Sequence, residues 1–115
     1  MKRGELWTVN GGPGYLGRPR PAVILQDDRF EATSSVTICP FTSDPTEAPL
    51  LRVLIDPSST NGLQVASRLM VDKITTVARS KVDRQIGRLA DEDLVRLNRA
   101  VMVFLGLAGS PPQGN

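Results

Sequence analysis

The chain has 115 residues, of which 40% are hydrophobic and 23% are charged, with fourteen basic residues against twelve acidic ones. This length and composition predict one soluble globular domain and exclude global disorder. One cysteine and no histidine exclude disulfide frameworks, zinc sites and histidine-based acid–base catalysis within one chain. An aromatic content of 4% argues against a protein that binds single-stranded nucleic acid by stacking its bases.

The N-terminal residues 1–10 carry basic and acidic side chains and lack the apolar stretch of a signal peptide. No window approaches the roughly 20 apolar residues that a membrane span needs. We therefore expect a cytoplasmic protein without a membrane segment.

Short strands are expected at residues 5–9, 22–26, 35–42, 50–55, 68–72 and 74–77, where apolar and β-branched residues stand between turn signals. Pro40 falls inside the third of these runs. Because proline cannot donate to a ladder, we expect an edge position or a bulge there. The glycine-rich stretch 11–14 predicts a mobile loop that extends to Pro19, and it lacks the Gly-Lys-Ser/Thr ending of a phosphate-binding loop.

The last element changes to a helical period. Leu94, Leu97 and Val101 share one helix face, and three acidic residues at 91–93 suit its N-terminal end. Gly106 or Gly109 can close the helix. We expect a single domain over residues 1–109, mainly β with a C-terminal helix and arranged as a small barrel, followed by a disordered tail at 110–115.

Four short motifs follow one another along the chain: RPAVIL at 20–25, PFTS at 40–43, NGL at 61–63 and DKITTV at 72–77. With KRGELW at 2–7 and FLGL at 104–107, this ordered set resembles the MazF/PemK/Kid family of toxins. The resemblance covers residues 2–107. It implies an SH3-like barrel with a C-terminal helix, a homodimer, and a metal-independent endoribonuclease that is held inactive by an antitoxin. It implies no cofactor.

The resemblance implies that Arg20 and Thr42 belong to the catalytic site, with Asp72 at an acidic position found in some members. RNA can be cut by its own 2′-hydroxyl, and an arginine fixed between two prolines can hold the phosphoryl oxygens through two parallel hydrogen bonds. Thr42 can donate to the same phosphate, with the backbone N–H groups of Ser43 and Asp44 as helpers. Asp72 is a candidate general base if burial raises its pKa.

RNA contacts beyond the reacting phosphate are expected from four polar residues near these motifs. These are Arg18, Ser43, Lys73 and Arg68. Simpler interpretations stay open: Arg20 as a solvated charge beside a turn, residues 42–45 as an ordinary turn, and Asp72 as the start of a hairpin. Cys39 lies in an apolar run and is expected to be an inert core residue.

Two other classes of function also fit a small β-rich chain. One is a CcdB-type inhibitor that binds DNA gyrase without catalysis, although its aromatic C-terminal tip is replaced here by Pro-Pro-Gln-Gly-Asn. The other is an RNA-binding module without cleavage, with Arg18, Arg20, Arg68, Lys73 and Arg79 as its basic footprint. The ordered Arg20 and Thr42 motifs favour the ribonuclease, whose substrate would be single-stranded messenger, transfer or ribosomal RNA.

Overall fold

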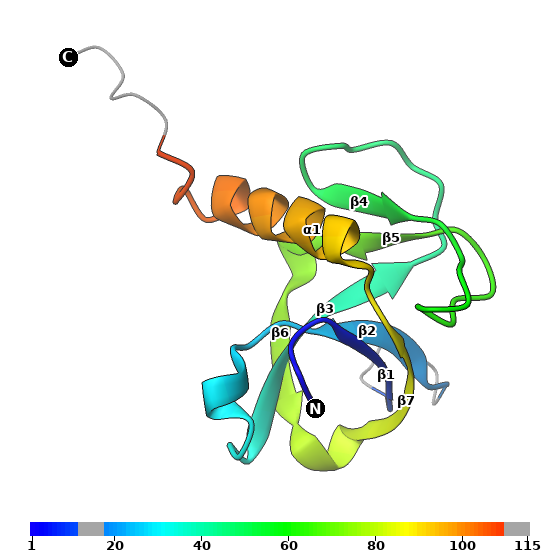
Figure 1. Ribbon diagram of the computed structural model, residues 1–115, viewed down its shortest axis with the longest axis vertical. Helices are drawn as coiled ribbons and strands as arrows, with labels where there is room; N and C mark the ends of the chain where they lie inside the picture. Colours follow the sequence, from blue (N-terminus) through cyan, green and yellow to red (C-terminus); the bar gives the residue numbers. More distant parts are fainter. Residues whose placement is uncertain (12–17, 110–115) are drawn as a thin grey trace.

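The computed structural model describes residues 1–11 and 18–109. Most of the predicted loop before Pro19, and the whole predicted tail at 110–115, therefore lie outside the described residues. The chain forms strands followed by one C-terminal α-helix (Figure 1). The strands are β1 (Glu5–Val9), β2 (Arg20–Ile24), β3 (Ser35–Thr42), β4 (Arg52–Ile55), β5 (Ser67–Met70), β6 (Thr75–Ala78) and β7 (Val82–Arg88), and the helix is α1 (Asp91–Phe104).

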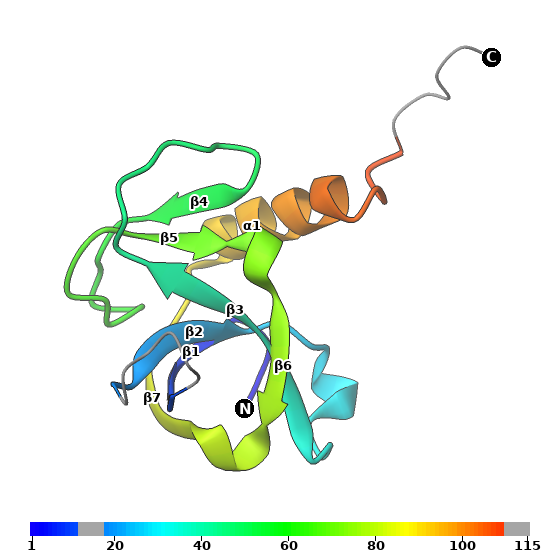
Figure 2. The ribbon, with the colours of Figure 1, turned by 180° about the vertical axis from the view of Figure 1, so that it is seen from behind.

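The strands pair antiparallel in the order β4-β5-β3-β2-β1-β7, with β6 joined to β3. The long strand β3 pairs with β2 along one edge and with β6 and then β5 along the other. The sheet curls into a barrel-like shape, with β4, β5 and α1 together at one end of it (Figure 2). The expected class, mainly β with a C-terminal helix, is confirmed.

Pro40 lies in a central strand, so the predicted edge position is wrong. It pairs with Ala22 of β2, whereas on the other edge of β3 the ladder with β6 ends at Ile38 and the ladder with β5 begins at Phe41. On this edge of β3, Pro40 thus falls in the gap between the β6 and β5 ladders. No backbone N–H is needed for strand pairing at this position, so proline is tolerated.

Two apolar clusters are separated by the central strands. Val23 and Cys39 face a cluster that includes Leu97 of α1, while Ala22 and Ile38 face the interior formed with β1, β6 and β7. Both faces of β2 and β3 are therefore buried, which explains why these strands appear in the sequence as continuous apolar runs.

The helix α1 ends at Phe104 and is closed, as expected, by Gly106, which has a φ of 74°. The N–H of Gly106 bonds the carbonyl of Val103, and the N–H of Leu107 bonds that of Met102, the pattern of a Schellman cap. Leu97 is the buried residue of this helix. No helix among the described residues is long and apolar enough to cross a membrane.

Candidate active site

Arg20 and Thr42 lie at the same end of neighbouring strands. Arg20 is the first residue of β2 and pairs with Val9 of β1, and Thr42 is the last residue of β3. The β2–β3 register pairs Ala22 with Pro40; the same register continued by two residues sets Arg20 opposite Thr42. Opposed residues of an antiparallel pair point to one face, so the sheet brings these two predicted site residues together.

The Thr42 hydroxyl is oriented by the loop that follows it. Its Oγ1 accepts a hydrogen bond of 3.1 Å from the backbone N–H of Asp44, which leaves the hydroxyl proton available for donation. The carboxylate of Asp44 in turn accepts from the N–H and hydroxyl of Thr46. The Asp44 N–H is thus bonded to Thr42 in this conformation, and its expected use as a phosphate donor stays a prediction.

Arg68 stands beside Thr42. It pairs with Thr42 in the β3–β5 ladder and with Leu54 in the β4–β5 ladder. Its Nη2 lies 3.0 Å from Oε1 of Glu47, a residue of the loop after β3. The Arg68 side chain is 13% exposed and that of Glu47 is 80% exposed. Ser43 and Arg18 are exposed near the same strand ends.

Asp72 lies beyond the other end of β5, in a 3-10 turn over Val71–Lys73. Both of its carboxylate oxygens bind Arg52, with Nε–Oδ1 and Nη2–Oδ2 distances of 3.0 and 3.1 Å. The hydrogen bonds from Arg52 hold the pKa of Asp72 below its ordinary value. The raised pKa that would favour a general base is thus not found, because an arginine partner outweighs desolvation. Lys73 is exposed next to it.

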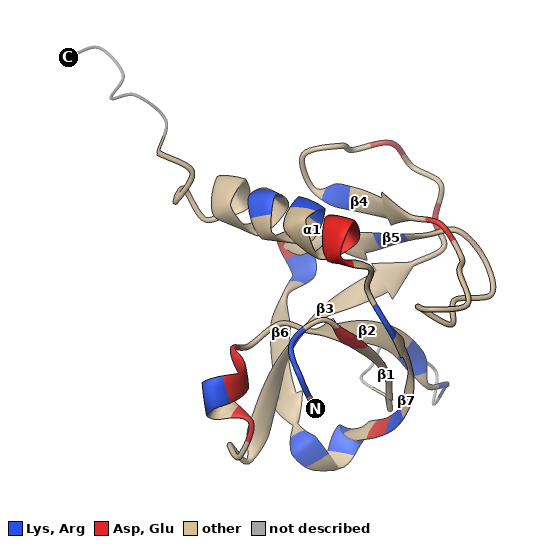
Figure 3. Cartoon of the chain, viewed as in Figure 1, with Lys and Arg blue, Asp and Glu red and all other residues tan. Residues whose placement is uncertain are grey.

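A cavity of about 350 Å³ lies between the β4 edge and α1. Aliphatic side chains form much of its wall, and Arg96 reaches across it to donate to the carbonyl oxygen of Leu54 at 2.9 Å. The basic residues of β4, β5 and α1 come together at this end of the molecule (Figure 3). The cavity is lined by Glu47, Pro49, Leu50, Arg52, Val53, Leu54, Arg68, Arg96, Arg99, Ala100 and Val103.

Sequence reasoning missed three of these arginines: Arg52, Arg96 and Arg99. The spacing of Arg96 and Arg99 places them on neighbouring positions of one helix face, which is a usable signal. That this face meets the β4 edge depends on tertiary packing alone.

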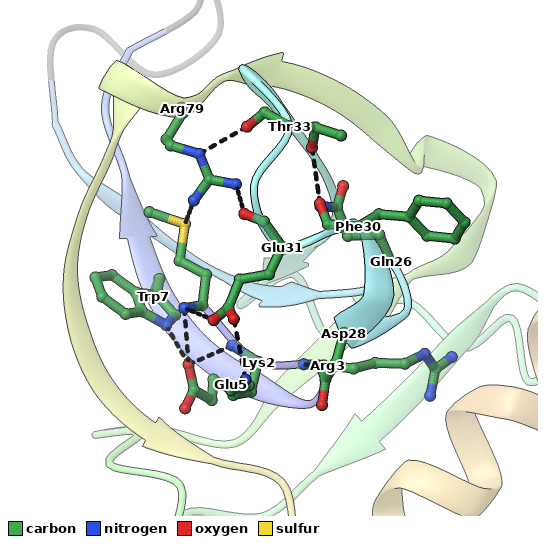
Figure 4. Close-up of polar contacts among 11 residues, drawn as sticks. Lys2, Arg3, Glu5, Trp7, Gln26, Asp28, Phe30, Glu31, Thr33 and Arg79 are labelled. Carbon is green, nitrogen blue, oxygen red and sulfur yellow. Dashed lines mark hydrogen bonds and ion pairs between the residues drawn. The ribbon is translucent and has the colours of Figure 1, made fainter.

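Arg79 is used within the fold. Its guanidinium donates to the backbone oxygens of Thr33 and Glu31 and to the sulfur of Met1, as the close-up of this cluster shows (Figure 4). The predicted basic footprint that included Arg79 is wrong on this residue, since its donors are directed inward.

Cys39 is buried, and burial raises the pKa of its thiol to about 12. The thiol is therefore a poor nucleophile, as expected for a core residue. Among residues 1–11 and 18–109, no group of three or more histidine, cysteine or acidic side chains is placed to hold a metal ion.

Comparison with known proteins identifies the class to which this chain belongs. Residues 2–105 match the family of PemK-like, MazF-like toxins of type II toxin–antitoxin systems. The chain is 53% identical to the probable endoribonuclease MazF of Mycolicibacterium smegmatis, over 95% of this chain and 100% of that protein. It is 32% identical to the endoribonuclease MazF9 of Mycobacterium tuberculosis, over 93% and 98% of the two chains.

A solved structure shows the same fold. It is described as an endoribonuclease in complex with its cognate antitoxin from mycobacterial species, and it matches with a TM-score of 0.78 and 20% identity over 97% of this chain and 99% of that chain. The chain therefore belongs to the MazF-like toxins of type II toxin–antitoxin systems and is a homologue of MazF endoribonucleases. The family and fold expected from the ordered motifs are confirmed.

Proposed function

We propose that this chain is an endoribonuclease toxin that cuts single-stranded regions of RNA without a metal ion, at a short sequence motif, and so stops translation and growth. The observation that supports the proposal is that Arg20 begins β2 and Thr42 ends β3, at positions that the β2–β3 register sets opposite each other when it is continued by two residues. The activity of the relatives, which carry the name endoribonuclease, supports it.

In the proposed reaction the 2′-oxygen of a ribose attacks the adjacent phosphorus and the bond to the 5′-oxygen breaks. Negative charge grows on the non-bridging oxygens of the phosphate. Arg20, fixed at the start of a strand between Pro19 and Pro21, would hold these oxygens through its planar fork. Thr42 would donate its hydroxyl proton to the same phosphate while Asp44 holds its oxygen in place.

Asp72 remains a proposed catalytic residue with a weaker role. Because Arg52 keeps its carboxylate ionised, it can accept the 2′ proton only as a weak base near neutral pH. We therefore expect loss of Asp72 to slow cleavage less than loss of Arg20.

Arg18, Ser43, Lys73 and Arg68 are the proposed RNA contacts outside the reacting phosphate. All four are described residues, and Arg18, Ser43 and Lys73 are exposed. Each cation that meets a phosphate contributes affinity that falls with salt. The setting of this activity would be the cytoplasm, where RNA substrates are found.

The proposed protein partners are a cognate antitoxin and a second copy of the chain. The solved relative carries a cognate antitoxin, and the basic balance of this chain suits an acidic partner segment. A homodimer is supported by the end of α1, where large apolar side chains stay exposed in the single chain. These are Met102, Val103, Phe104, Leu105 and Leu107, with exposed fractions of 45 to 65%.

The test is incubation of the purified protein with a mixed RNA pool in excess EDTA, followed by sequencing of both new ends. Wild type should cut at a short recurrent motif. Arg20→Ala and Thr42→Ala should each slow cleavage, the former by about 100- to 1,000-fold. Arg88→Ala, an exposed arginine at the opposite end of β1 from the Arg20 pairing, is the matched control and should cut normally. Binding of RNA without cleavage by wild type would instead support the non-catalytic module.

A further inference from the structure

The Arg68 side chain is largely buried next to the proposed position of the reacting phosphate. It is directly opposite Thr42 in the β3–β5 ladder, and opposed side chains in such a pair stand about 5 Å apart at their Cβ atoms. Only 13% of its side chain is exposed. An RNA strand whose phosphate reaches Thr42 therefore passes this guanidinium.

The partner of Arg68 is held much less firmly. Glu47 belongs to the exposed loop after β3, and its side chain is 80% exposed. Among residues 1–11 and 18–109, its side chain makes one hydrogen-bonded contact, the 3.0 Å ion pair to Arg68. An ion pair whose carboxylate is this exposed contributes little to stability, so another anion can replace the carboxylate at small cost.

The charged residues around the cavity are mostly basic, and Glu47 is the exception. Among the described residues that line it, Glu47 is the one carboxylate beside four arginines, Arg52, Arg68, Arg96 and Arg99. Arg52 and Arg96 are bound by Asp72 and Asp93. Removal of Glu47 would therefore leave Arg68 without its ion-pair partner next to Thr42, with Asp44 as a more distant acidic neighbour.

We propose that Glu47 occupies the position of an RNA phosphate on Arg68, and that a phosphate flanking the cleaved one displaces it when substrate binds. This inference rests on the proposed function. Glu47 then limits RNA affinity without touching the reacting atoms: it is an internal competitor whose loss should tighten binding and leave the rate of the chemical step unchanged. RNA is favoured over a peptide as the displacing anion because Arg68 adjoins Thr42.

The experiment measures the affinity of wild type, Glu47→Gln, Arg68→Gln and the double variant for a non-cleavable RNA that carries the cut motif with a 2′-deoxy group at the cleavage position. Fluorescence anisotropy between 50 and 300 mM salt gives both affinity and its salt dependence, with these concentrations chosen as roughly the range where phosphate contacts dominate. Glu92→Gln is the matched control, since it makes the same change of charge at an exposed residue of α1.

Glu47→Gln should bind RNA about 3- to 10-fold more tightly at low salt, with the slope of log affinity against log salt steeper by up to about 0.7. The single-turnover cleavage rate on normal RNA should stay as in wild type. In the Arg68→Gln background the same change should give no more tightening than Glu92→Gln gives.

Three results would overturn the inference. Tightening by Glu47→Gln that is no larger than that of Glu92→Gln, or that persists without Arg68, would mean that only net charge matters. Unchanged RNA affinity with tighter binding of a synthetic peptide rich in leucine and glutamate would make the cavity a peptide site. If wild type cuts RNA while any of these three results is found, the proposed endoribonuclease function stands and only the role of Glu47 is rejected. If wild type neither binds nor cuts RNA, both the proposed function and the role of Glu47 are rejected.

Discussion

Two loops leave successive strands of this fold and are held in opposite ways. The loop at 56–66, after β4, is fixed by buried contacts: Asn61 is 2% exposed, its Oδ1 accepts from the N–H groups of Ser58 and Leu63, and its Nδ2 donates to the carbonyl of Asp56. The loop at 43–51, after β3, is held over its first part by the exposed turn at Asp44 and by the ion pair of Glu47 with Arg68, and at its end by the hydrogen bond from the N–H of Val71 to the carbonyl of Leu51.

The difference shows where the chain places its rigid interactions. The loop at 56–66 is packed onto β7, so that a Cβ at Gly87 would stand 2.4 Å from the backbone of Thr60 and Asn61. The loop at 43–51 adjoins Thr42 and keeps contacts that a ligand can exchange. A rigid scaffold with an adaptable loop at its proposed site is a common division of labour.

The largest effect should follow from Gly62→Ala in the rigid loop. Gly62 has a φ of 73°, and a Cβ there would lie 2.1 Å from the carbonyl oxygen of Ile86. Left-handed strain and a clash with backbone together should cost about 3 kcal/mol, or roughly 15 °C in Tm. Thermal unfolding followed by circular dichroism measures this. Ser59→Ala, a change at an exposed residue of the same loop, is the control and should leave Tm unchanged. Equal Tm values for the two variants would contradict the prediction and show that the loop shifts to accommodate the added Cβ.

Asn61→Ala should have the next largest effect. It leaves two backbone N–H groups and one carbonyl without their partner in a buried turn, and we expect a loss of about 2 to 3 kcal/mol. Urea denaturation gives the free energy of unfolding. Ser58→Ala removes one hydrogen bond, that from the N–H of Asn61, and should cost about 1 kcal/mol. A loss for Asn61→Ala no larger than this would mean that water replaces the side chain.

Much of this fold was predictable because its strands coincide with apolar, β-branched runs: β1 and β3 have the predicted bounds, and the other predicted strands are shifted by one or two residues. β7 was missed, since Val82 is its only buried residue and, apart from Ile86 and Gly87, the rest of its sequence is polar. Pro40 was misplaced because the gap between the β6 and β5 ladders depends on pairings far apart in the chain.

The candidate site divides in the same manner. Arg20 and Thr42 were predicted from local motifs, and the β2–β3 register, continued by two residues, sets them opposite each other. The partner of Asp72 could not be predicted, because Arg52 precedes it by 20 residues and meets it only through the β4–β5 ladder. Glu47 could not be predicted as a site residue, because its sequence context is only that of an exposed loop. Its proposed role depends on its ion pair with Arg68, which is far from it in the sequence.

Two ion pairs near the cavity give a sharper comparison than the loops. Arg52–Asp72 is bidentate, with side chains 19% and 22% exposed. Because the folded-state pKa of Asp72 is lowered, the pair stabilises the fold above the unfolded pKa of about 3.9 and loses this as pH falls through the folded value. Asp72→Asn should therefore cost about 1 kcal/mol at pH 7, and the difference from wild type should shrink as the pH falls below the unfolded pKa of Asp72. Urea denaturation across this range measures it, and a difference independent of pH would contradict the ion-pair explanation.

The smallest effect on stability should come from Glu47→Gln. Its carboxylate is 80% exposed and makes one contact to Arg68, so water screens the pair and the side chain loses entropy in forming it. We expect a change in the free energy of unfolding below about 0.5 kcal/mol at any pH between 3 and 8, measured beside Asp72→Asn under the same conditions. A loss as large as that of Asp72→Asn would show that Glu47 holds the loop at 43–51 in place. The carboxylate could not then be exchanged cheaply for an RNA phosphate, so a near-neutral result for stability is what the proposed displacement requires.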